Sequence, residues 1–149
     1  NLALVGIRTR GVILAKRLQH KIQEIENFNV DFGVLDITLY RDDLGKGKQN
    51  PTLKKTDITF PIDDKKIILC DDVLFTGRTI RAALAELNDL GRPGAVRLYS
   101  LIDRGGRELP IQPDHFGKKI SASFSDRIDV RLQETDGEEG VYVVYGGMR

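Results

Sequence analysis

The apolar residues of this chain fall into two patterns: short continuous runs, and longer stretches with a repeat of three or four residues. Residues 1–7, 66–70 and 95–102 form continuous runs, which are typical of buried strands. Residues 30–40 carry apolar side chains at both odd and even positions, so we expect a further strand that is buried on both faces.

The helical repeat occurs in two stretches. Apolar side chains recur at three- and four-residue spacing from 12 to 26 and again from 79 to 90, which predicts two helices with one buried stripe each. Gly91 follows the second stretch and is expected to provide its C-cap.

The order of these elements predicts an α/β fold, with a twisted, mostly parallel sheet flanked by helices. Residues 127–132 and 140–146 alternate like late strands. Residues 41–57 are rich in charge and glycine and are expected to form a flexible lid, while residues 103–119 form a small irregular hood. Because no repeat or linker divides the chain, we expect residues 1–149 to form a single domain.

Composition narrows the class of protein without identifying it. The 149 residues are 40% hydrophobic and 30% charged, as in an ordinary globular domain. The net charge of +1 gives no protein-wide basic field of the kind that indicates nucleic acid binding. The single Cys70 excludes an internal disulfide and lies in an apolar run, and no run approaches the roughly 18 residues of a membrane span. We therefore expect a cytoplasmic protein with Cys70 in its core and no membrane partner.

Three loops rich in charge and glycine each follow a predicted strand. Their sequences are RTRG (8–11), DDVLFTGRT (71–79) and DRGGR (103–107). Ligands of open parallel sheets bind beyond the carboxyl ends of the strands, so we expect these three loops to share one pocket.

The central loop has the composition of a site for a phosphorylated sugar. A turn of small residues at a helix N-terminus directs several backbone N–H groups at one point, and Gly77 allows a close approach to an anion. The adjacent Asp71 and Asp72 would repel that anion, but they can accept hydrogen bonds from sugar hydroxyls or hold Mg²⁺. A plain helix-capping turn is the alternative, which the whole string between a strand and an amphipathic helix disfavours.

These residues also resemble a known family. IILCDDVLFTGRT (67–79) is similar to the phosphoribosyl pyrophosphate signature of type I phosphoribosyltransferases. LVGIRTRG, DITLYRDDL, GRP and DRGGRELPI resemble the pyrimidine-operon regulator branch of that family, and the resemblance extends from Leu4 to about Leu132. It implies a type I phosphoribosyltransferase fold with a hood. It also implies a helical segment before the first strand, which we expect is missing upstream of Asn1.

The resemblance implies a reaction in which uracil and phosphoribosyl pyrophosphate give UMP and pyrophosphate, with Mg²⁺ as the cofactor. Asp71, Asp72, Arg10 and Arg41 would be catalytic, and the two aspartates would hold the metal through water and pyrophosphate. Thr9 and Arg10 lie where the family has its pyrophosphate loop, which often contains a non-proline cis peptide bond. The implied phosphoribosyl pyrophosphate and nucleotide contacts are Thr9, Arg10, Asp71, Asp72, Val73, Leu74, Phe75, Thr76, Gly77, Arg78 and Thr79.

The resemblance also implies sites for base recognition and for RNA binding. Uracil would contact Ile102, Asp103, Arg104 and Ile128, although Asp103 could equally be a turn residue that binds its own backbone. Attenuator RNA, bound under control of UMP, would contact Thr9, Arg107 and Lys118.

Two departures from the family pattern concern the RNA contacts, because Gly106 replaces a histidine and Gln112 an arginine. The open alternatives are transfer to another base without RNA binding, RNA regulation with vestigial catalysis, and phosphosugar binding without catalysis. A homodimer or higher homo-oligomer is expected from the resemblance.

Overall fold

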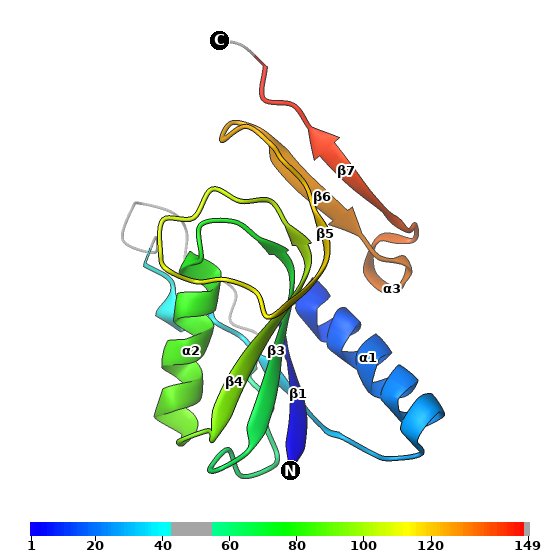
Figure 1. Ribbon diagram of the computed structural model, residues 1–149, viewed down its shortest axis with the longest axis vertical. Coiled ribbons are helices and arrows are strands. Elements are labelled where there is room, and N and C mark those ends of the chain that lie inside the picture. Colours follow the sequence, from blue (N-terminus) through cyan, green and yellow to red (C-terminus); the bar gives the residue numbers. More distant parts are fainter. Residues whose placement is uncertain (43–54, 148–149) are drawn as a thin grey trace.

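The computed structural model describes residues 1–42 and 55–147 of the chain, and the predicted lid therefore lies largely outside the described residues. A five-stranded parallel sheet forms the centre, and a two-stranded antiparallel ribbon lies beyond one end of it (Figure 1). The elements are β1 (Leu2–Ile7), α1 (Arg10–Glu26), β2 (Asp31–Leu35), η1 (Thr38–Tyr40), β3 (Lys66–Leu74), α2 (Arg78–Leu90), β4 (Ala95–Asp103), β5 (His115–Lys119), β6 (Arg127–Arg131), α3 (Gln133–Asp136) and β7 (Gly140–Val144).

The predicted α/β class is confirmed, and the strand order explains where a site can form. The strands lie in the order β2-β1-β3-β4-β5, so the chain moves outward in opposite directions from the central pair β1 and β3. The crossover helices α1 and α2 consequently cover opposite faces of the sheet (Figure 1). Since the loops after β1 and β3 diverge, they leave an opening at the carboxyl ends of these two strands.

Glycines allow α1 to pack unusually close to the sheet. A Cβ atom on Gly11 would lie 2.3 Å from the carbonyl oxygen of Cys70 in β3, and one on Gly6 would lie 2.4 Å from the Cα of Val12. Cys70 itself is fully buried, which confirms its expected place in the core.

Two predicted boundaries on the second and third strands are wrong. The strand expected over 30–40 ends at Leu35 and is followed by a short 3₁₀ helix, because the chain turns into the opening instead of extending the sheet. Asp71 and Asp72 do not follow the strand of residues 66–70 but belong to it, since β3 stays paired with β4 as far as Leu74.

The hood predicted over 103–119 is irregular only in its first part. Residues 115–119 form the edge strand β5. This strand was not predicted because its sequence, HFGKK, is charged and contains glycine. The two late strands are confirmed as the ribbon of β6 and β7, with α3 in their connection. None of the helices in residues 1–42 and 55–147 combines the length and apolar character that a membrane span requires.

The contact between α1 and β3 generates a stability prediction. We expect Gly11→Ala to lower the free energy of unfolding by about 1–3 kcal/mol, because the added methyl group overlaps the carbonyl oxygen of Cys70. Urea unfolding followed by circular dichroism measures this, with Gly147→Ala as the control because a Cβ there meets nothing within 4 Å. Equal stabilities of the two variants would contradict the proposed close packing.

Candidate active site

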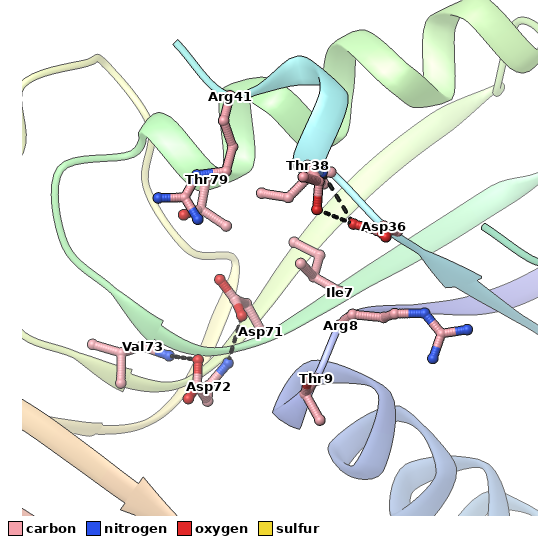
Figure 2. A pocket seen from close by; sticks show the side chains of 11 residues that line it. Ile7, Arg8, Thr9, Asp36, Thr38, Arg41, Asp71, Asp72, Val73 and Thr79 are labelled. Carbon is pink, nitrogen blue, oxygen red and sulfur yellow. Dashed lines mark hydrogen bonds between the residues drawn. The ribbon is translucent and has the colours of Figure 1, made fainter. Parts of the chain in front are cut away.

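A cavity of about 360 Å³ opens at the carboxyl ends of β1 and β3, where the strand order changes direction. The loops after β1, β2 and β3 surround it (Figure 2). The lining residues are Ile7, Arg8, Thr9, Asp36, Ile37, Thr38, Arg41, Asp71, Asp72, Val73 and Thr79. The loop after β4 does not belong to this set, so the expectation that it shares the same pocket is wrong.

The acid pair lies on the floor of this cavity. Asp71 is 6% exposed, and its Oδ1 accepts a hydrogen bond from the backbone N–H of Asp72 at 2.9 Å (Figure 2). The Oδ1 of Asp72 accepts one from the N–H of Val73 at 2.9 Å. Burial, together with the neighbouring Asp72, raises the pKa of Asp71 well above its usual value. One buried and one more accessible carboxylate therefore face the cavity.

The turn after β3 has the features of a phosphate site. Gly77 has a φ of 93° and stands at the N-cap of α2, where it offers no side-chain cap. The N–H of Arg78 donates to Thr76 Oγ1 at 3.3 Å, and the N–H groups of the first turn have no acceptor within the helix. A smaller cavity of about 230 Å³ lies beside it, lined by Arg41, Asp42, Thr76, Arg78 and Thr79. Helix N-termini of this kind bind anions through N–H groups and the helix dipole.

The loop after β1 has an unusual backbone. The peptide bond between Arg8 and Thr9 is cis, as the family resemblance implied. The guanidinium of Arg8 extends away from the acid pair (Figure 2) and donates to the carbonyl of Lys55 at 2.8 and 3.2 Å. Thr9 lines the cavity, whereas the guanidinium of Arg10 is directed to Asp136, with Nη2–Oδ1 and Nε–Oδ2 distances of 2.7 and 3.2 Å.

The second strand contributes residues that the sequence reasoning missed. Asp36 and Thr38 follow β2 and line the cavity, and the Thr38 hydroxyl and N–H both donate to Asp36 Oδ1. The N–H of Asp36 donates to Thr56 Oγ1 at 2.9 Å, and the Thr56 hydroxyl donates to the buried Glu86 of α2. Their position directly after a parallel strand could have identified them. The expectation of a longer strand over 30–40 placed them inside that strand instead.

Comparisons with known proteins agree with this geometry. The family model for the phosphoribosyl transferase domain matches residues 1–135. A relative from Elusimicrobium minutum, named Bifunctional protein PyrR, is 53% identical over 140 residues, which cover 94% of this chain and 78% of the relative. A protein of the same name from Acetivibrio thermocellus is 56% identical over 137 residues, or 92% and 74% of the two chains. The chain belongs to the PyrR family of phosphoribosyltransferases.

Solved structures place this PyrR family member within the type I phosphoribosyltransferase fold. The hypoxanthine phosphoribosyltransferase of Trypanosoma cruzi superposes with a TM-score of 0.70 at 16% identity, over 99% of this chain and 78% of that chain. The Staphylococcus aureus enzyme gives 0.64 at 20% identity, over 93% and 73%. At these identities the likeness concerns the fold alone.

The four residues predicted for uracil lie together near the carboxyl end of β4. Ile102 and Ile128 pack in one apolar cluster, against which Val73 of the main cavity also packs. Burial opposes ionisation of Asp103, but hydrogen bonds from the N–H of Gly105 and from Arg107 lower its pKa, as expected of the turn residue in the alternative interpretation.

Arg104 is 6% exposed and its side chain is held within the protein. Its guanidinium carbon lies 3.8 Å from the ring centre of Phe75, and its Nη atoms donate to the carbonyls of Ser123 and Asp126 at 2.7 Å. The ring of Phe75 is further packed against Phe124, with centroids 5.0 Å apart. Arg104 therefore links the turn after β3 to the segment before β6.

The two basic residues predicted for RNA have different environments. Arg107 has a side chain only 13% exposed, which donates to Asp103, Ile111 and the carbonyl of Phe75. Lys118 is exposed on the edge strand β5. A second cavity of about 330 Å³ lies nearby, lined by Asp103, Arg104, Gly105, Arg107, Gln112, Lys119, Ile120 and Ser121.

The cavity suits Mg²⁺ that arrives with a phosphorylated substrate. Asp36, Asp71 and Asp72 present carboxylate oxygens, which are the ligands that Mg²⁺ prefers. Within residues 1–42 and 55–147, no group of three or more His, Cys, Asp or Glu residues is arranged to hold a metal by itself. A metal bound through one or two carboxylates and substrate phosphates needs no such group.

The buried Glu86 predicts a pH dependence of stability. Burial raises its pKa, the hydrogen bond from Thr56 opposes that shift, and the nearby Asp36 and Asp89 add to it. A carboxyl whose pKa is raised on folding stabilises the protein below its unfolded pKa of about 4.3, and this contribution is lost as pH rises through the folded pKa. We therefore expect the melting temperature of Glu86→Gln, relative to wild type, to increase between pH 4.5 and pH 8.

Differential scanning calorimetry across that pH range provides the measurement. Glu26→Gln at the exposed end of α1 removes the same charge and serves as the control. If the difference in melting temperature between Glu86→Gln and wild type does not change with pH, burial does not raise the pKa of Glu86.

Proposed function

We propose that this chain is a uracil phosphoribosyltransferase that also regulates pyrimidine biosynthesis through nucleotide-dependent binding of attenuator RNA. The observation that carries the enzymatic part is the joint placement of the acid pair and the uncapped α2 N-terminus, on either side of Thr79. Ribose 5-phosphate has hydroxyl donors at one end and a phosphate at the other. The two adjoining cavities match that order of groups.

Binding of the phosphoribosyl group is assigned to β3 and the turn that follows it. The carboxylates of Asp71 and Asp72 accept hydrogen bonds from the ribose hydroxyls, and residues 75–79 bind the 5-phosphate through backbone N–H groups and the Thr76 and Thr79 hydroxyls. This fixes the anomeric carbon near Val73, which lines the cavity. Orientation of two reactants in this way lowers the entropic part of the barrier.

Pyrophosphate departure is assigned to the loops after β1 and β2. Cleavage of the anomeric C–O bond develops negative charge on the leaving group, which Thr9, the backbone N–H of Arg10 and the side chain of Arg41 stabilise. Asp71 and Asp72 would hold Mg²⁺ through water, and this metal would supply further positive charge for the leaving group. The base enters against Val73, close to Ile128 and the end of β4, where the cluster of apolar side chains excludes water.

A panel of bases tests the substrate. We expect turnover with uracil, labelled phosphoribosyl pyrophosphate and Mg²⁺, and none with hypoxanthine or orotate. Turnover of hypoxanthine without turnover of uracil would refute the assignment of the base while leaving the phosphoribosyl site intact.

The acid pair generates a kinetic prediction. We expect Asp72→Asn to lower kcat by at least about tenfold, or roughly 1.4 kcal/mol of barrier, because a neutral amide can neither balance the oxocarbenium-like ribose nor hold metal-linked water. Steady-state kinetics measures kcat of this variant and of the control Asp31→Asn. Asp31 lies at the opposite end of the sheet, at the start of β2, so the control removes a surface charge far from the site. An unchanged kcat would remove the acid pair from the mechanism.

The regulatory part of the proposal is supported by the PyrR names of the relatives and by the cations near the second cavity. The exposed Lys118 and Lys119 offer contacts to phosphates, and Arg107 would have to leave its internal partners to join them. Loops with unstacked bases are the usual targets of sequence-specific RNA binding. Filter binding to a pyrimidine leader RNA, with and without UMP, tests it. If the leader RNA binds no more tightly than an unrelated RNA at low salt, the regulatory part of the proposal is refuted and only the enzymatic part remains.

A further inference from the structure

Two arginines of α1 hold the connection between β6 and β7. Arg10 donates from Nη2 and Nε to the two carboxylate oxygens of Asp136 at 2.7 and 3.2 Å. Arg17, about two turns further along the helix, makes four hydrogen bonds of 2.5 to 3.0 Å with Glu134 and Glu139. α3 accordingly lies beside the beginning of α1 (Figure 1).

Only the first of these contacts adjoins the proposed pyrophosphate loop. Arg10 directly follows Thr9, which lines the main cavity, while no residue of the β6–β7 ribbon lines that cavity. The side chains of Arg10 and Asp136 are 31% and 17% exposed, so the pair is partly shielded from water. The hydrogen bond to Asp136 raises the pKa of Arg10, and the negative charge of the nearby Asp72 adds to that effect.

Asp136 is itself held firmly. Its Oδ2 accepts from the N–H of Leu132 at 2.8 Å, and its own N–H donates to the carbonyl of Leu132 at 2.7 Å. Leu132 is 2% exposed and belongs to the same apolar cluster as Leu14 of α1. The carboxylate that receives Arg10 is therefore fixed relative to the core.

The arrangement leaves the backbone at the start of α1 available for an anion. Thr9 is the N-cap residue but forms no side-chain capping hydrogen bond. The first N–H groups of an α-helix have no partner within the helix, and here they adjoin the cavity in which the pyrophosphate group is expected. The side chain of Arg10 is meanwhile paired with Asp136.

We propose that Asp136 is a positioning residue for pyrophosphate binding, which acts by holding Arg10 and thereby the backbone of residues 8–10. In this role the side chain of Arg10 anchors the loop and its N–H group meets the pyrophosphate. The inference rests on the proposed function and deepens it, because it makes the C-terminal ribbon part of the substrate site.

Asp136→Asn tests this role with a nearly isosteric change. The amide retains one acceptor for Arg10 but loses the charge and the second acceptor, so the loop is no longer fixed by a bidentate pair. We expect the KM for phosphoribosyl pyrophosphate and the Kd for Mg²⁺–pyrophosphate, measured by titration calorimetry, to rise by about tenfold. The KM for uracil should stay within about twofold of wild type.

Glu139→Gln is the matched control, because it weakens the Arg17 contact to the same connection without touching the loop. The hydrogen bonds from Arg17 and the Gln133 N–H lower the pKa of Glu139 to about 2, so this contact also stabilises the fold. We expect the control to lower the melting temperature while both constants for pyrophosphate-containing ligands stay unchanged. A similar rise in both variants would mean that the ribbon acts through general stability, and would overturn the proposal.

A double-mutant cycle with Arg10→Met asks whether Asp136 acts through Arg10. If it does, Asp136→Asn should add nothing to the Kd for Mg²⁺–pyrophosphate in the Arg10→Met background. Additive effects, an unchanged Kd or a lower Kd in Asp136→Asn would each overturn the proposal, the last by showing that Asp136 competes with pyrophosphate.

The proposed function and the positioning role of Asp136 can be refuted separately. Wild-type protein that binds Mg²⁺–pyrophosphate but does not convert uracil would refute the proposed function, while the calorimetric comparison would still test Asp136. Active wild-type protein with an unaffected Asp136→Asn variant would refute only the role of Asp136.

Discussion

The site depends on how closely α1 approaches β3. Gly11 lies against the carbonyl oxygen of Cys70, and a single Cβ atom would not fit between them. Gly11 stands in the first turn of α1, and Cys70 directly precedes Asp71. One backbone contact therefore sets the separation of the two loops that face each other across the cavity, and it also directs α1 toward the C-terminal ribbon.

The sequence allowed the prediction of the sheet, of both long helices and of the turn between β3 and α2, because each has a local signal. A continuous apolar run marks β3, a three-to-four repeat marks α2, and the string DDVLFTGRT joins them. These are short-range patterns, and their physical causes lie within a few residues.

The features that escaped prediction are those decided by distant partners. β5 has neither an apolar run nor alternation, and it is a strand because the edge of β4 is free to pair with it. Arg10 was expected to contact phosphoribosyl pyrophosphate, but its guanidinium is paired with Asp136, which lies 126 positions away. Glu86 is buried although a helical carboxylate is usually exposed, and its partner Thr56 lies 30 positions away. Side-chain pairing of this kind has no periodic signature in the sequence.

Phe75 leaves no room for a side chain at position 106. Gly106 has a φ of 75°, and a Cβ atom there would lie 2.4 Å from the ring of Phe75, which Arg104 and Phe124 already enclose. A residue with a side chain at this place would require the ring of Phe75 to shift. The residue that position 106 can accept is therefore conditional on the residue at position 75.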